Sequence, residues 1–145
     1  VDPVVNYPAT AQQWNGLSKA ENFAARWSGG LRISVGGTYT FALSSNDGSV
    51  LLINGAEVVN NDGHHDMETR LASVDLPAGD HCIVLLYIQA LGQSGLTFEY
   101  TGPDTGSLMV TVPTSVLLIP QAPVSLASND TAQVGLAGLL GGLLA

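Results

Sequence analysis

Hydrophobic and polar residues alternate in short runs along most of the chain from residue 31 onward. In residues 38–43, Tyr39, Phe41 and Leu43 alternate with Thr or Ala, which is the two-residue period of a strand with one buried face. Asn54-Gly55 is a favoured type I′ hairpin pair, because both residues tolerate positive φ. Similar runs occur at residues 31–35, 50–53, 56–59, 71–76, 82–88, 96–100, 108–112 and 116–119. This spacing predicts an all-β fold, an antiparallel β-sandwich of jelly-roll-like form.

Residues 82–88 do not fit an isolated sandwich, because they are apolar on both faces and an outer strand normally has one polar face. They suit either a central strand with a loop packed over it or a surface that contacts another molecule. Cys82 begins this run, and we expect a buried, inert thiol there, since a reactive cysteine needs an accessible, electropositive setting. The chain has one cysteine, so it has no internal disulfide. A short helix is conceivable only within residues 9–25, where Asn15-Gly16 interrupts it.

The C-terminal segment is the second feature that a solitary sandwich does not explain. Its leucines recur at i, i+3, i+4, i+7 and i+8, as one stripe of a helix, at Leu136, Leu139, Leu140, Leu143 and Leu144. Burying them gains on the order of 10 kcal/mol, whereas ordering residues 134–145 costs roughly 1.5 kcal/mol per residue. The segment is also shorter than the roughly 20 residues of a membrane span. We therefore predict that it docks onto protein, either its own sandwich or a neighbouring copy.

Composition and charge narrow the class of partner. Four Lys or Arg residues against twelve Asp or Glu residues give a formal net charge of −8, and the four cations form no cluster. Nucleic acid and anionic membranes are therefore excluded as partners, because both need clustered positive charge. Charged residues make up only 11% of the chain, which suits an extracellular or cell-surface protein. Asn129 begins an Asn-Asp-Thr acceptor site for N-glycosylation.

An ordered series of motifs resembles the protective-antigen domain family, which a bacterial toxin component shares with many glycosidases, yeast flocculins and adhesins. The series comprises Asn22-Phe23-Ala24-Ala25-Arg26-Trp27-Ser28-Gly29-Gly30-Leu31, the stretch from Gly37 to Gly48, Ile53-Asn54-Gly55, Leu76-Pro77-Ala78-Gly79-Asp80-His81, Tyr87, and Phe98-Glu99-Tyr100-Thr101-Gly102-Pro103. The resemblance implies a β-sandwich over residues 22–119, flanked by an N-terminal segment, 1–21, and a C-terminal linker and apolar arm, 120–145. It also implies a frequent role in binding carbohydrate.

In the adhesin branch of that family, two consecutive aspartates before a glycine hold a calcium ion that contacts sugar hydroxyls. In this chain Asn46 stands at the first of those positions and Asp47 at the second, before Gly48. Calcium takes six to eight oxygen ligands, usually including several carboxylates, so the substitution removes one negative charge. The resemblance implies a possible calcium site at Asn46 and Asp47, and the alternative is that Asn46-Asp47-Gly48 only makes a turn.

The polar loop of residues 60–65 is the other candidate for binding. His64 and His65 are adjacent, so in an extended chain they point to opposite sides and do not form a zinc site. If this loop converges with Asn46 and Asp47, then Asn61, Asp62 and His64 can supply hydrogen bonds to a glycan. No pair of carboxylates has a spacing that indicates glycoside hydrolysis, and we expect no catalysis.

Two functions remain open from the sequence. One is a non-enzymatic structural module that assembles through its apolar arm into a homo-oligomer, a fibre or a coat. The other is a lectin-like, carbohydrate-binding adhesin domain that uses calcium or does without it. The degraded aspartate pair and the unexplained arm favour the first, and the resemblance favours the second.

Overall fold

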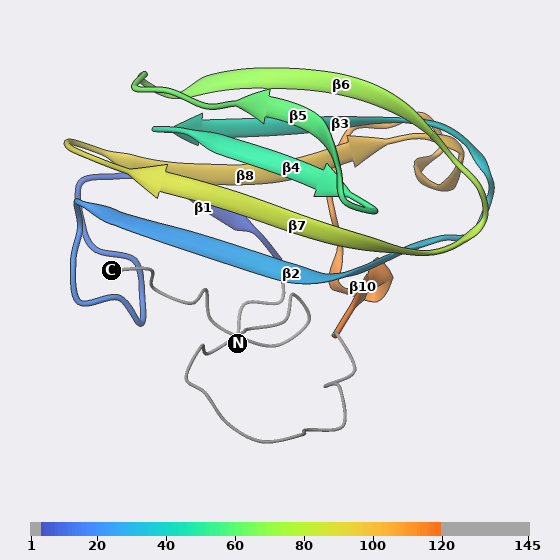
Figure 1. Cartoon of the computed structure of the whole chain (residues 1–145), viewed down its shortest axis with the longest axis horizontal. Helices are drawn as coiled ribbons and strands as arrows, with labels where there is room; N and C mark the ends of the chain where they lie inside the picture. The colour runs from blue at the N-terminus through green and yellow to red at the C-terminus, as the bar shows by residue number, and fades with distance from the viewer. Residues whose placement is uncertain (1–3, 120–145) are drawn as a thin grey trace.

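Two antiparallel β-sheets pack face to face in the computed structural model, which describes residues 4–119 (Figure 1). The first sheet has the order β1-β8-β3-β6, with β9 paired to β8: β1 Asn6–Thr10, β8 Ser94–Thr101, β3 Gly37–Asn46, β6 Glu68–Leu76 and β9 Val110–Thr111. The second has the order β10-β2-β7-β4-β5: β10 Leu117–Leu118, β2 Phe23–Ile33, β7 Gly79–Gln89, β4 Ser49–Ile53 and β5 Ala56–Asn61. Short 3₁₀ turns lie at Pro103–Thr105 and Thr114–Val116. The predicted β-sandwich is confirmed.

The core lies between the two sheets and is built from the inward face of each strand. Tyr39, Phe41 and Leu43 of β3 are fully buried, as their alternation predicts. Trp14 also enters this core, where its ring stacks on Tyr7 with ring centroids 4.1 Å apart. Since β1 belongs to the first sheet, the segment before residue 22 contributes both a strand and core side chains to the sandwich.

The first half of the chain departs from the sequence-based prediction. Residues 4–119 contain no α-helix, so the helix considered within residues 9–25 is not formed. Strand β2 begins at Phe23 rather than at residue 31 and runs through Gly29-Gly30. A Cβ on Gly30 would lie 3.0 Å from Cβ of Leu118, so this glycine permits the close approach of β10.

Strand β7 explains the run that is apolar on both faces. It lies inside the second sheet, between β2 and β4, and buries Ile83, Leu85 and Tyr87 against the first sheet. The alternate residues point outward, and Cys82 among them is exposed, so the prediction of a buried thiol is wrong. Cys82 was assigned to the wrong face of the strand, because adjacent residues of a strand point to opposite faces of the sheet.

Three connections meet at one end of the sandwich, on the left in Figure 1: the β3–β4 turn, the β5–β6 loop and the β7–β8 loop. The hairpin at the other end of β4 has positive φ at both Asn54 (51°) and Gly55 (81°), as the type I′ prediction requires. None of the helices within residues 4–119 has the length and hydrophobicity to cross a membrane. The leucines predicted for assembly and the acceptor Asn129 lie outside the described residues.

Candidate functional site

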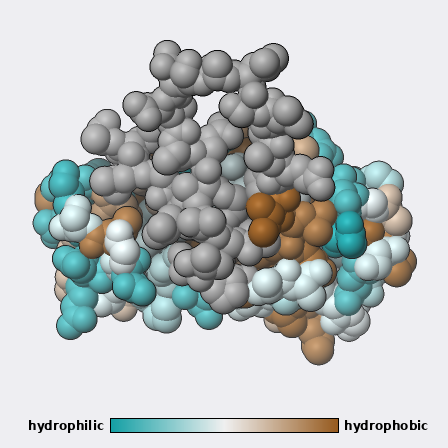
Figure 2. All heavy atoms as spheres, turned by 90° about the horizontal axis from the view of Figure 1, so that it is seen from below, coloured by the Kyte–Doolittle hydropathy of each residue, from teal (hydrophilic) through white to brown (hydrophobic). Residues whose placement is uncertain are grey.

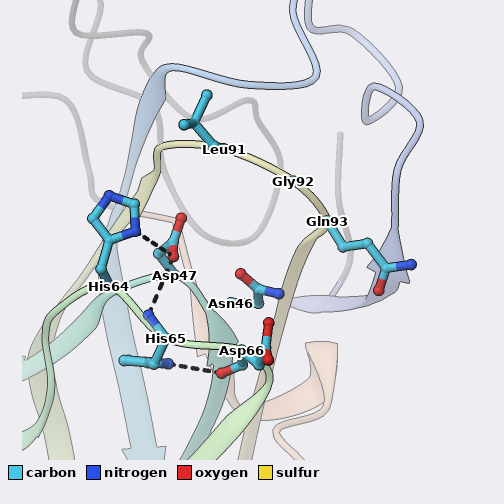
Figure 3. Close-up of a pocket in the computed structure, with 8 residues that line it drawn as sticks. All are labelled: Asn46, Asp47, His64, His65, Asp66, Leu91, Gly92 and Gln93. Carbon is cyan, nitrogen blue, oxygen red and sulfur yellow. Dashed lines mark hydrogen bonds and ion pairs between the residues drawn. The ribbon is translucent and has the colours of Figure 1, made fainter.

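A polar pocket of about 490 Å³ lies where the three connections meet (Figure 3). It is lined by Asn46, Asp47, His64, His65, Asp66, Leu91, Gly92 and Gln93. These residues come from the β3–β4 turn, the β5–β6 loop and the β7–β8 loop, so segments far apart in the sequence form one site. The pairing of β4 with β7 sets Ser49 opposite Tyr87, and the backbone N–H of Ile88 donates to the carbonyl of Gly48 at 2.8 Å. This register brings Asp47 beside the end of β7.

Asp47 is buried at the base of the pocket, where it joins the three connections. Its Oδ1 accepts a hydrogen bond from the backbone N–H of His65 at 3.3 Å and lies 3.2 Å from Nδ1 of His64. Its Oδ2 accepts from the backbone N–H of Ala90 at 2.9 Å. The side chains of His64 and Asp47 point toward each other in Figure 3. The carboxylate therefore holds the β5–β6 loop and the end of β7 against the turn after β3.

The polar groups behind Asp47 are buried and fully engaged. The hydroxyl of Tyr87 donates to the carbonyl oxygen of Asn46 at 2.5 Å, across a peptide bond Asn46–Asp47 that is cis. The side-chain oxygen of Gln89 accepts from the backbone N–H of Asp47 at 3.2 Å, and its Nε2 donates to the carbonyl of Leu91 at 3.1 Å. Burial raises the pKa of Tyr87 well above its usual range, so the phenol remains a donor at physiological pH.

His65 stabilises the β5–β6 loop through both nitrogens of its ring. Its Nδ1 lies 2.8 Å from the carbonyl oxygen of Asp66, and its Nε2 lies 3.0 Å from that of Asn61. Burial lowers the pKa of His65, but these two carbonyls, with the charges of Glu68 and Asp47, outweigh it and raise the pKa above its usual value. The raised pKa follows from geometry, because both ring nitrogens can donate to carbonyls only when the imidazole is protonated.

The mouth of the pocket consists of exposed groups with free hydrogen-bonding capacity or apolar surface. The side chain of His64 is 71% exposed, and Asp66 and Gln93 are also exposed. Leu91 adds an exposed apolar side chain, and in Figure 3 both Leu91 and Gln93 point away from Asp47. A carboxylate, an imidazole and amides around one hollow can exchange hydrogen bonds with a polar ligand in both directions.

Of the residues predicted to bind a glycan, the structure brings Asn46, Asp47 and His64 into the pocket. It does not bring Asn61 there, because this residue is 2% exposed and its amide donates to the hydroxyl of Ser45 at 3.0 Å and to the carbonyl of Glu68 at 2.9 Å. Asp62 is exposed and also lies outside the pocket, and its Oδ1 accepts from the backbone N–H of Gly63 at 2.9 Å. Asn61 thus stabilises the loop, and Asp62 shapes the turn within it.

The sequence-based interpretation missed Asp66 and residues 91–93. It assigned no role to the segment after β7, and from the polar loop it named Asn61, Asp62 and His64 but not Asp66. One feature of the sequence could have indicated the segment after β7. Gln89 lies two residues after Tyr87 and so faces the same buried side of the strand, and a buried Gln needs polar partners nearby.

The calcium site that the resemblance implies at Asn46 and Asp47 stays a prediction. Within residues 4–119, no group of three or more His, Cys, Asp or Glu side chains is arranged to hold a metal ion. Calcium takes six to eight oxygens, and here the carboxylate of Asp47 and the carbonyls of Asn46 and Leu91 accept hydrogen bonds from the protein.

Comparisons with known proteins show which family and which solved structures this chain is similar to. The sequence pattern of the PA14 domain matches residues 1–110. An anti-sigma factor domain-containing protein superposes with a TM-score of 0.75 at 19% identity, covering 87% of this chain and 44% of that chain. The PA14 domain of the antifreeze protein MpAFP superposes with a TM-score of 0.68 at 20% identity, covering 85% of this chain and 76% of that chain.

A third solved structure, a PA14 sugar-binding domain from an RTX adhesin, superposes with a TM-score of 0.66 at 20% identity, covering 79% of this chain and 75% of that chain. A comparison with curated protein sequences gives no significant match. The chain spans less than half of the anti-sigma factor domain-containing protein, so the likeness to that protein concerns one of its parts. At these identities the structural likenesses concern the fold.

Proposed function

The chain belongs to the PA14 domain family, and from this premise we propose that it is a non-enzymatic carbohydrate-binding module that acts outside the cell or at its surface. The observation that carries the proposal is the pocket at the end of the sandwich, where three connections present polar groups around a hollow of about 490 Å³. Binding sites of this kind fix a few polar groups on a rigid scaffold and leave the ligand-facing side open.

The chemistry of the mouth suits sugar hydroxyls, which donate and accept hydrogen bonds at once. Asp66 offers a carboxylate that accepts, and Gln93 offers an amide that does both. His64 adds an imidazole, and Leu91 gives an exposed apolar surface for the C–H groups of a sugar ring. The net charge of −8 disfavours polyanionic glycans and favours neutral ones. The fold shared with the sugar-binding domain of an RTX adhesin supports the same ligand class.

Glycan screening followed by calorimetry tests the proposal. We expect the protein to bind a neutral glycan, and Asp66→Ala or Gln93→Ala to weaken binding by about fivefold each, because one lost hydrogen bond is worth about 1 kcal/mol. Glu99→Gln is the matched control, since it removes a carboxylate from β8 at a position outside the pocket. Failure to bind any glycan, or rim variants that bind as tightly as the wild type, would contradict the proposal.

A second candidate function is self-assembly into a homo-oligomer, a fibre or a coat, and it is favoured by exposed apolar surface. Leu86 and Ile88 on the outer face of β7 are 36% and 54% exposed, beside the exposed Cys82. Figure 2 shows further hydrophobic residues on the lower face of the molecule, the side of β2 and β10 in Figure 1. A contiguous apolar surface on a soluble protein marks a site that contacts another molecule.

Deletion of residues 135–145 tests the part that the sequence assigns to the apolar arm. We expect the full-length protein to assemble and the deletion variant to remain a monomer, as measured by light scattering and electron microscopy. A matched variant, Leu86→Ser with Ile88→Ser, reports on the outer face of β7 while keeping the arm. If the full-length protein remains a monomer at high concentration, self-assembly is refuted as a function. The proposal of glycan binding does not depend on that result.

A further inference from the structure

We infer that this pocket binds sugar hydroxyls directly, without a calcium ion, because three donors of the protein already face the buried carboxylate of Asp47 that would hold the ion. The inference rests on the proposed function, and it names how the same site recognises its ligand. It also departs from what the resemblance to the adhesin branch implies for Asn46 and Asp47.

The single carboxylate at the base of the pocket has little capacity left for a cation. Each carboxylate oxygen offers about two lone-pair positions. Oδ1 of Asp47 faces two donors, the backbone N–H of His65 at 3.3 Å and Nδ1 of His64 at 3.2 Å. Oδ2 faces the backbone N–H of Ala90 at 2.9 Å. One lone pair remains, whereas calcium takes six to eight oxygens.

Two carbonyl oxygens around the pocket each accept one hydrogen bond from the protein and keep one lone pair. The carbonyl of Asn46 accepts from the hydroxyl of Tyr87 at 2.5 Å, and that of Leu91 accepts from Nε2 of Gln89 at 3.1 Å. Gln89 is 1% exposed, and its side-chain oxygen accepts from the backbone N–H of Asp47. If this amide were rotated by 180°, its NH₂ group would face the backbone N–H of Asp47, and two donors would oppose each other. Its nitrogen is therefore held toward the carbonyl of Leu91, so that carbonyl faces a hydrogen-bond donor.

The groups left over are those that bind a hydroxyl. With Nδ1 of His64 held by Asp47, the other ring nitrogen points away from the carboxylate at the mouth (Figure 3). The amide of Asn46, at the position where the resembling adhesins have an aspartate, can both donate to and accept from a sugar. Asp66 and Gln93 stand across the same mouth. Direct hydrogen bonds thus replace the ion-mediated contacts.

Two measurements on chelator-treated full-length protein test the inference. Calorimetry with CaCl₂ is expected to show no binding, and the melting temperature is expected to shift by less than about 1 °C in 2 mM CaCl₂. Glycan affinity is expected to agree within about twofold in EDTA and in CaCl₂. Glycan binding that requires calcium would overturn the inference and leave the proposed function standing. Absence of glycan binding under both conditions would refute the proposed function and the inference together.

A gain-of-function variant tests the cause. Asn46→Asp combined with Gln89→Ala adds a carboxylate and releases the carbonyl of Leu91, so we expect it to acquire a calcium-dependent rise in melting temperature of several degrees. Gln13→Glu is the matched control, because it adds the same charge at an exposed position outside the pocket. A wild type that gains as much from calcium as the double variant would contradict the inference. A double variant that ignores calcium would show that engaged oxygens are not what excludes the ion.

Discussion

Replacing Asp47 by Asn is the sharpest test of how the site is held together. The substitution keeps the size of the side chain, but it leaves one acceptor oxygen where three donors now converge: the backbone N–H groups of His65 and Ala90, and Nδ1 of His64. In either orientation the new NH₂ group faces one backbone N–H. A hydrogen bond to a charged group contributes about 1.5–3 kcal/mol, and an unsatisfied buried donor costs a similar amount.

We therefore expect Asp47→Asn to lower the free energy of unfolding by about 2–3 kcal/mol. For a domain of this size, that corresponds to a fall in melting temperature of roughly 10 °C. Urea unfolding followed by tryptophan fluorescence measures the free energy, and calorimetry measures the melting temperature. Glycan binding should fall too, since the loop that carries His64 loses its attachment.

Asp66→Asn is the matched control, because it removes a carboxylate at the rim of the same pocket from an exposed side chain. Its free energy of unfolding should stay within about 0.5 kcal/mol of the wild type. The reasoning fails if Asp47→Asn melts within about 2 °C of the wild type. That result would mean that the contacts of Asp47 do not stabilise the fold and that the loops are held by other interactions.

Three further predictions follow from the packing. Gly102→Ala should destabilise the fold by about 3 kcal/mol in urea unfolding, because the new Cβ would lie 2.3 Å from the buried ring of Tyr39; a wild-type midpoint would contradict this contact. Burial raises the pKa of Tyr39 from 10.0 to about 12, so the folded state keeps a proton that the unfolded chain loses. Stability is then fully present below pH 10 and falls as the pH rises from about 10 to 12, and Tyr39→Phe should flatten this fall in urea titrations. Asn61→Ala should cost about 2 kcal/mol of stability, because the hydroxyl of Ser45 and the carbonyl of Glu68 lose their donor; unchanged thermal unfolding would show that these bonds contribute nothing net.

Local patterns predicted the strands well where alternation was uninterrupted. Tyr39, Phe41 and Leu43 are buried as their period requires, and the Asn54-Gly55 hairpin forms as its composition indicates. The prediction missed the part of β2 before residue 31, because glycines such as Gly29-Gly30 interrupt an alternating pattern but can lie within a strand and let another strand approach closely. That distinction depends on β10, more than eighty residues further along the chain.

The candidate site was predicted only in part. Asn46, Asp47 and His64 were identified from the resemblance and from their polar loops, and they lie together in the pocket. Asn61 belongs to the same polar loop as His64, yet its side chain points inward and donates hydrogen bonds to buried acceptors. Whether a polar residue in a loop faces solvent or the interior depends on which acceptors the fold leaves unsatisfied beside it, and a sequence pattern does not contain that information.

What the sequence by itself determined is the class of fold, the faces of most strands and the net negative charge. These follow from short-range periodicity and composition, which are properties of neighbouring residues. Only the tertiary structure decided that residues 46–47, 64–66 and 91–93 share one pocket, and that three donors of the protein face the carboxylate of Asp47. The physical reason is register: the pairing of β4 with β7 sets Asp47 beside Ala90, and this pairing is a long-range consequence of packing the whole core.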